Sequence, residues 1–165
     1  MKKFTLKLII FVVIIASVTM TINSIYVKRC KRDLDHINKF ASIPETVQIC
    51  NFGSSHGLHG YNYEDLEDDY DCFNFALSSQ YLSYDYRLFQ YYGDHIDDGT
   101  VVFITVSYFS LFGESEVSNG SFNSKNRRYY SILPASLIKE YDLKTSLIVR
   151  HIPAVVAELN ILIRT

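Results

Sequence analysis

Residues 45–60 read ETVQICNFGSSHGLHG, and this stretch decides which fold the sequence predicts. Its first half follows Pro44 and is rich in β-branched and apolar residues, which predicts a β-strand over residues 45–52. Its second half, residues 53–60, holds three glycines, so we expect the strand to stop at Gly53 and a turn to follow.

The segments that follow continue an alternation of strands and helices. Residues 72–77 predict a second short strand, and residues 81–92 carry apolar side chains at helical spacing. Residues 100–106 form a continuous β-branched run, typical of a strand buried on both faces of a parallel sheet. The order strand, loop, strand, helix, strand predicts an α/β layered fold with right-handed crossovers. Further along, we expect helices over residues 132–141 and 145–163.

The N-terminal segment differs from the rest in composition and in charge. Residues 8–27 form a run of twenty residues without a charge, flanked by Lys2, Lys3 and Lys7 and by a basic cluster at 28–32. A helix of this length crosses about 30 Å of hydrocarbon, so we expect a single transmembrane helix in contact with membrane lipid. A cleaved signal peptide and a buried soluble helix are the alternatives.

Charge divides the chain at residue 32. The first 32 residues carry seven Lys and Arg and no acid, whereas the other 133 carry nine bases and eighteen acids. This acidic balance argues against nucleic-acid binding by the folded part. We therefore expect a basic-flanked anchor over residues 1–32 and one partial α/β domain over residues 33–165.

Cysteine and histidine spacing gives no reason to expect a metal or another cofactor. Three cysteines leave one unpaired in any disulfide framework, and their spacing fits no zinc site. His56 and His59 lie in a glycine-containing stretch for which we do not expect a helix, so we expect no metal there. Histidine at position 56 fits a pocket lining better than a ligand set.

The turn after the first strand places Ser55 where a nucleophile could stand. A serine that follows a strand directly can present its hydroxyl at the sheet edge, close to backbone N–H groups that could receive an oxyanion. Gly, Ser and Ser are also ordinary turn residues, so this short motif alone does not identify a site.

Two sequence blocks together resemble the SGNH/GDSL hydrolase family, in particular its membrane-anchored members that act on cell-envelope polymers. The blocks are ICNFGSSHG at 49–57 and FNFALSSQ at 73–80. The resemblance implies a three-layer, mainly parallel sheet of flavodoxin-like type, preceded by the transmembrane helix. It also implies Ser55 as the nucleophile, Asn74 and Ser79 at the oxyanion-hole positions, and a pocket lined by Ser54, His56 and Ser107.

The chain departs from the family pattern in two places. The third family block carries an Asn, whereas residues 106–109 read VSYF. The family's acid and base form an Asp-x-x-His pattern near the end of the domain, and we expect no such pattern in this chain, since no carboxylate precedes His151 over 147–150. We therefore expect the catalytic His and Asp to be missing from this chain.

These features lead to one functional expectation and one alternative. The resemblance implies the front part of a membrane-anchored serine esterase or acyltransferase of envelope glycans, inactive as this chain because a serine without a base is a poor nucleophile. With three strands where the family has about five, we also expect an exposed sheet edge. The alternative is a naturally short, non-enzymatic anchored protein that binds or assembles through a degenerate scaffold.

The membrane topology follows from the short N-terminal tail and from the family resemblance, because the basic residues on the two sides of the span nearly cancel. Seven residues precede the span, as in an uncleaved signal anchor, so we expect the N-terminus inside and residues 33–165 outside the cytoplasm. Alkaline phosphatase fused after Thr165 should be active in cells. An inactive phosphatase together with an active cytosolic reporter at the same joint would contradict this topology.

Overall fold

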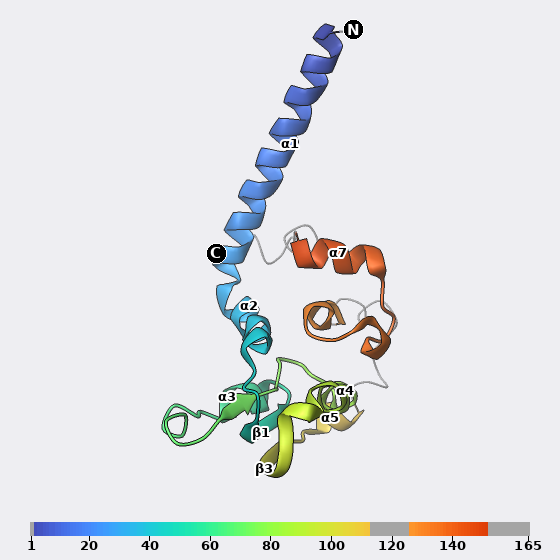
Figure 1. Cartoon of the computed structure of the whole chain (residues 1–165). Coiled ribbons are helices and arrows are strands. Elements are labelled where there is room, and N and C mark those ends of the chain that lie inside the picture. Colours follow the sequence, from blue (N-terminus) through green and yellow to red (C-terminus); the bar gives the residue numbers. More distant parts are fainter. Residues whose placement is uncertain (1, 113–125, 152–165) are drawn as a thin grey trace. The chain divides into compact units, whose positions relative to one another are not determined.

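The computed structural model describes residues 2–112 and 126–151. The chain divides into two compact units, one formed by residues 1–35 with 142–165 and the other by residues 36–141. Figure 1 shows the long helix of the first unit and the sheet of the second.

The first unit contains the membrane-spanning candidate. Helix α1, Lys2–Arg29, is long and apolar enough to cross a membrane, and its apolar side chains between Phe4 and Val27 are exposed. Lys28 and Arg29 lie in its last turn, where the negative end of the helix dipole stabilises basic side chains. The sequence prediction of one long apolar helix is confirmed.

The second helix of this unit begins earlier than predicted. Helix α7, Leu143–His151, follows Asp142, whose carboxylate accepts a hydrogen bond from the Thr145 N–H at 2.8 Å. Such a contact satisfies one of the open N–H groups of a first helical turn. The rest of the helix expected over 145–163 lies outside the described residues.

A three-stranded parallel sheet organises the second unit. The strands are β1 (Val47–Gly53), β2 (Cys72–Asn74) and β3 (Ile96–Thr105), in the order β2-β1-β3. β1 is central, and its residue Asn51 pairs with Asn74 of β2 and Phe103 of β3. Parallel pairing places the carboxyl ends of the strands at one edge of the sheet.

Two helices connect the strands, and the sequence predicts the second of them but not the first. In chain order, α3 (Ser55–Gly60) follows β1 and precedes β2, and α4 (Leu82–Tyr92) follows β2 and precedes β3. Both helices are labelled in Figure 1. The α/β arrangement is therefore confirmed. The other elements of the described residues are α2 (Lys31–Asn38), η1 (Lys39–Ser42), η2 (Gly93–His95), α5 (Tyr108–Phe112), η3 (Arg127–Ser131) and η4 (Ala135–Leu137).

Aromatic side chains fill the core of this unit. Phe52 of β1 stacks on Phe75 with ring centroids 4.8 Å apart, and Phe73 meets Phe75 edge to face at 4.6 Å. Phe40 of η1 and Tyr92 of α4 contact the same ring. These contacts attach α4 and η1 to the sheet, because offset and edge-on aromatic pairs add to the stabilisation from burial.

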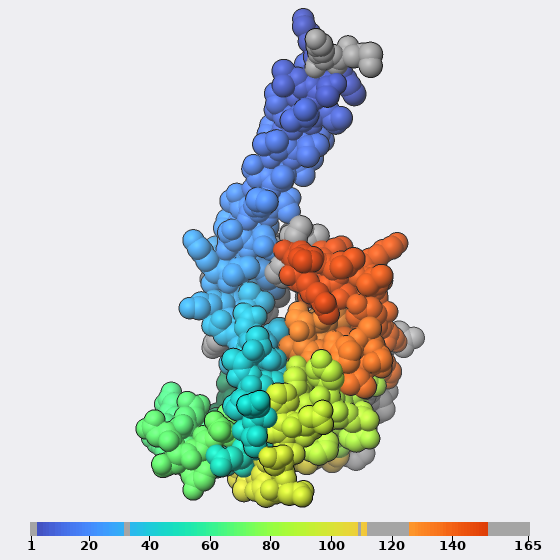
Figure 2. Space-filling model, viewed as in Figure 1, coloured from blue at the N-terminus to red at the C-terminus, as the bar shows by residue number. Residues whose placement is uncertain are grey.

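Strand β3 confirms one expectation and corrects another. Its apolar residues Val101, Val102, Phe103 and Ile104 are 36–58% exposed, so the prediction of a strand buried on both faces is wrong for the described sheet. The reason is its place at the edge, next to β1 alone. The exposed edge that we expected is present, and yellow atoms of this part of the chain lie at the surface in Figure 2.

The helix predicted over 132–141 is replaced by single turns. Long-range donors bind the carbonyls that a helix would use: Tyr92 Oη binds Ile132 O at 2.6 Å, Arg87 Nη1 binds Leu137 O at 3.1 Å, and Asn126 Nδ2 binds Lys139 O at 2.8 Å. Glu140 then adopts a left-handed backbone with φ 55°. Tertiary hydrogen bonds thus override the local helical preference.

Glycine substitutions test how closely β1 and β3 approach at the sheet edge. Gly53 has φ +137°, and a Cβ there would lie 2.8 Å from Thr105 O, whereas Gly99 has φ +102° with open space around it. Gly99→Ala should lower the free energy of unfolding by about 1 to 3 kcal/mol through backbone strain. Gly53→Ala should suffer the same strain and lose about 1 to 3 kcal/mol more of its free energy of unfolding, because the new Cβ overpacks against Thr105.

The control is Gly60→Ala, because a Cβ at Gly60 meets nothing within 4 Å and its φ is not positive. Urea unfolding of the detergent-solubilised chain measures all three variants. Equal stabilities of the Gly53 and Gly60 variants would show that the close approach to Thr105 is not a constraint.

Candidate functional site

The turn that carries Ser55 is held close to the end of β1. β1 ends at Gly53, Ser54 is the N-cap of α3, and Ser55 is the first helical residue. Ser54 is buried, Ser55 is half-buried, and its hydroxyl has no hydrogen-bond partner among the described residues. The strand therefore passes into a helix through the single residue Ser54, and this places Ser55 at the carboxyl edge of the sheet.

Asparagine side chains fix α3 against the sheet. Asn51, fully buried in β1, donates to Gly57 O at 3.0 Å and to Asn74 Oδ1 at 3.1 Å, and accepts from Tyr63 Oη at 2.9 Å. Asn74 Nδ2 contacts Gly57 O at 3.2 Å and Leu58 O at 3.3 Å. Buried amides with all these partners stabilise one position of α3.

Gly57 explains why a helix forms where the sequence analysis expected a turn. A Cβ at Gly57 would lie 3.1 Å from Phe52 O and from Ala76 Cβ. The glycine lets α3 approach the strands closely enough for the asparagine contacts, and this packing outweighs the low helix propensity of glycine. The expectation that residues 53–60 contain no helix is wrong.

The second predicted turn has the backbone of a glycine position. Ser79 adopts a left-handed conformation with φ 55°, which is uncommon for a side chain other than Gly, Asn or Asp. Its N–H has no hydrogen-bond partner among the described residues, so it can donate to a ligand. Asn74, by contrast, uses its side-chain amide to hold α3. Its part in an oxyanion hole stays a prediction.

Asp85 links the two turns through one carboxylate oxygen. Its Oδ1 accepts the Gly53 N–H at 2.9 Å and the Gln80 side-chain amide at 2.5 Å. Gln80 also donates to Phe75 O at 3.3 Å and accepts from Tyr129 Oη at 3.2 Å. The Asp85 side chain is buried, and burial raises its pKa to about 6, against the opposing effect of the two hydrogen bonds.

The other predicted pocket residues lie at the same sheet edge with different exposures. His56 is exposed on α3. Ser107 follows β3 by two residues, and its hydroxyl lies 2.8 Å from Ser110 Oγ, so it is occupied within its own turn. The strand ends therefore bring Ser54, Ser55, Ser79 and Ser107 to one edge, while no described hydrogen bond joins Ser107 to the others.

One histidine pair corrects the analysis of the catalytic motif. An Asp-x-x-His spacing does occur in the chain, at Asp33 and His36, ahead of β1 instead of after β3. The His36 ring meets His59 of α3 edge-on, with centroids 5.9 Å apart. His59 lies four residues after Ser55 and so on the same face of the helix, yet it makes no described hydrogen bond to the Ser55 hydroxyl.

The sequence patterns gave no sign of two charged groups, the buried Asp85 and the half-buried Lys39. Asp85 was hidden in an amphipathic helix pattern. Lys39 donates to Ala76 O at 3.2 Å, and burial lowers its pKa to about 8. Each group has a hydrogen-bond partner more than thirty positions away, Gly53 for Asp85 and Ala76 for Lys39, and no local pattern marks these contacts.

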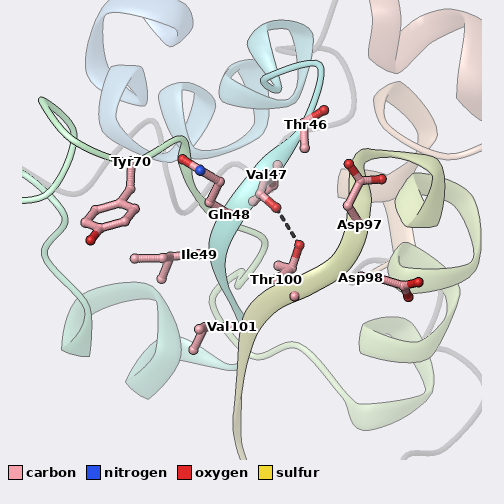
Figure 3. Close-up of a pocket in the computed structure, with 10 residues that line it drawn as sticks. Thr46, Val47, Gln48, Ile49, Tyr70, Asp97, Asp98, Thr100 and Val101 are labelled. Carbon is pink, nitrogen blue, oxygen red and sulfur yellow. Dashed lines mark hydrogen bonds between the residues drawn. The ribbon is translucent and has the colours of Figure 1, made fainter.

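A hollow of about 550 Å³ lies at the other end of β1, around its first residues and the start of β3. Figure 3 shows Tyr70 and Ile49 on one side of it and Asp97 on the other, with the hydrogen bond from Thr100 Oγ1 to Val47 O between the strands. None of the predicted site residues lines it. It is therefore separate from the Ser55 edge.

Metal-ligating side chains do not gather within residues 2–112 and 126–151, where no group of three or more His, Cys, Asp or Glu could hold an ion. The acidic stretch over 64–71 is exposed and lies at the surface, in green, in Figure 2. Burial raises the pKa of the Cys50 thiol to about 11, so this cysteine is an inert core residue.

Comparisons with protein-family models, with curated proteins and with solved structures found no match to this chain.

The buried carboxyl of Asp85 predicts a pH dependence of stability. Its pKa is about 6 in the folded chain against an ordinary 3.8, so the folded state retains the proton longer than the unfolded state. The free energy of unfolding should therefore fall by about 3 kcal/mol as the pH rises from about 4 to about 6. Asp85→Asn should lack this fall.

Urea unfolding of both chains between pH 4 and pH 7 measures the difference, because every other titrating group contributes equally to both. The Asn variant should gain stability relative to the natural chain as the pH rises. A difference that stays constant over this range would contradict the raised pKa.

Proposed function

We propose that the chain carries the nucleophile half of a membrane-anchored, SGNH-type serine acyl esterase or acyltransferase. Ser55 would attack the acyl carbon of an ester on an envelope glycan, form an acyl-serine and release the sugar hydroxyl. Water or a second hydroxyl would then take the acyl group and restore the serine.

The observation that carries this proposal is the geometry at the end of β1. A half-buried serine begins a helix two residues after the central strand of a parallel sheet, at the edge where α/β proteins bind ligands. The same strand, turn and helix expose the nucleophile in other serine hydrolases.

The Ser79 turn supports the match to the second block of the family. Where the family usually has glycine, Ser79 adopts φ 55°, a conformation that favours glycine. Its N–H has no described partner, and a backbone donor is what an oxyanion hole requires.

The membrane location of the substrate rests on the N-terminal helix. The apolar length of α1 fits a single span, and the proposed topology places the α/β unit on the outer side of the membrane. A tethered enzyme there would meet acylated envelope polysaccharide.

A non-enzymatic role is the second candidate, because two polar side chains at the edge are already occupied. Ser107 pairs with Ser110, and the Asn74 amide holds α3. A serine also needs a base, and none hydrogen bonds to Ser55 within the described residues. On this alternative the same edge binds a ligand or assembles with a partner without turnover.

A fluorophosphonate probe tests the proposal, since it reacts with activated serines. Membranes from cells that express the longest product of this gene should show one labelled band, and Ser55→Ala should abolish the labelling. Ser136→Ala is the matched control, because Ser136 is an exposed serine of η4 outside both turns, and it should label normally.

Two results would contradict the enzyme proposal. Labelling that survives in Ser55→Ala would place the reactive group elsewhere. A complete lack of labelling in the natural chain would favour the binding role.

A further inference from the structure

Two turns of the proposed site are joined by one buried side chain. Gly53 lies two residues before Ser55, and Gln80 follows Ser79 directly. The same oxygen of Asp85 accepts the Gly53 N–H at 2.9 Å and the Gln80 amide at 2.5 Å. The turn that carries Ser55 and the turn that carries Ser79 therefore share one hydrogen-bond acceptor, the Asp85 Oδ1 atom.

The surroundings of Asp85 fix this acceptor in place. Asp85 lies in the first turn of α4, where its N–H binds Tyr81 O at 3.1 Å. Gln80 cannot rotate freely, because its amide also donates to Phe75 O and its oxygen accepts from Tyr129 Oη. Tyr129 in turn stacks on Tyr84 of α4, with ring centroids 3.8 Å apart.

The hydrogen bonds of the buried Asp85 carboxylate are better suited to holding the two turns in position than to filling space in the core. Asp85 is 5% exposed, and its second oxygen has no hydrogen-bond partner among the described residues. A buried carboxylate costs stability, and an apolar side chain of similar size would fill the space without that cost. Unlike an apolar side chain, the carboxylate can accept charge-assisted hydrogen bonds from both turns.

We propose that Asp85 is a positioning residue that holds the Ser55 turn and the Ser79 turn in register for acyl transfer. The inference rests on the proposed function, because the register matters only if Ser55 attacks a carbonyl whose oxygen the Ser79 N–H receives. Asp85 itself touches neither substrate nor nucleophile in this role. A small shift of one turn relative to the other would then reduce the rate steeply.

Hydrogen exchange of the full chain in detergent tests the bridge without relying on catalysis. Asp85→Ala should speed amide exchange by about tenfold or more in residues 53–57 and 78–80 together, since both turns lose an ionic hydrogen bond. Asp85→Asn keeps an oxygen acceptor and should stay within about threefold of the natural chain. Asp94→Ala is the control, because Asp94 is an exposed acid just beyond α4.

The thiol of Cys50 shows whether each variant still folds. Cys50 is fully buried in β1, so a folded chain protects it from maleimide. If Asp85→Ala exposes Cys50, the variant Gln80→Leu replaces it in the test. Gln80→Leu should speed amide exchange in residues 78–80 and leave the exchange of residues 53–57 unchanged, because the hydrogen bond from the Gly53 N–H to Asp85 remains. The inference fails if a folded Asp85→Ala leaves either turn unchanged, or if Gln80→Leu loosens both turns or neither.

The rate of fluorophosphonate labelling connects the bridge to the chemistry. Asp85→Ala should label Ser55 about 10- to 100-fold more slowly, with Asp85→Asn restoring most of the rate. Loosened turns with an unchanged labelling rate would overturn the positioning role. If the natural chain does not label at all, the proposed function fails, while the exchange result still decides whether Asp85 couples the turns.

Discussion

The hydrogen bond between the Gly53 N–H and the buried carboxylate of Asp85 is the contact on which the sheet edge depends. It attaches the end of the central strand to α4, and Gln80 extends the link to the Ser79 turn. Gly53 can occupy this position because it has no Cβ to meet Thr105 of the neighbouring strand. The direction of the chain as it enters α3 follows from these contacts.

The same edge combines a rigid support with an open side. Asn51, Asn74 and Gly57 hold α3 against the strands. Ser55 is therefore the first residue of a helix whose position is fixed. Strand β3, in contrast, leaves apolar residues exposed at the edge of the described sheet. Among the described residues of this unit, 36–112 and 126–141, side chains hold α3 in place beneath Ser55, whereas apolar residues of β3 stay exposed.

Local sequence patterns predicted the three strands, α1 and α4, and missed the elements and contacts that depend on distant residues. Strand β1, helix α4 and the apolar α1 follow from composition and periodicity, which are local properties. The Asp85 bridge joins residues 32 positions apart, and α3 forms because Gly57 packs closely, so neither has a local signal. The helix expected over 132–141 failed for the same reason, since distant side chains bind its carbonyls.

The central claim is that Ser55 becomes acylated in the longest product of this gene, and peptide mass spectrometry after brief exposure to an activated acetyl ester measures this most directly. The account predicts an acetyl group on the peptide that contains Ser55, and none on that peptide from the Ser55→Ala chain. Acetylation confined to other residues, or an unmodified Ser55 peptide while the ester is turned over, would contradict it.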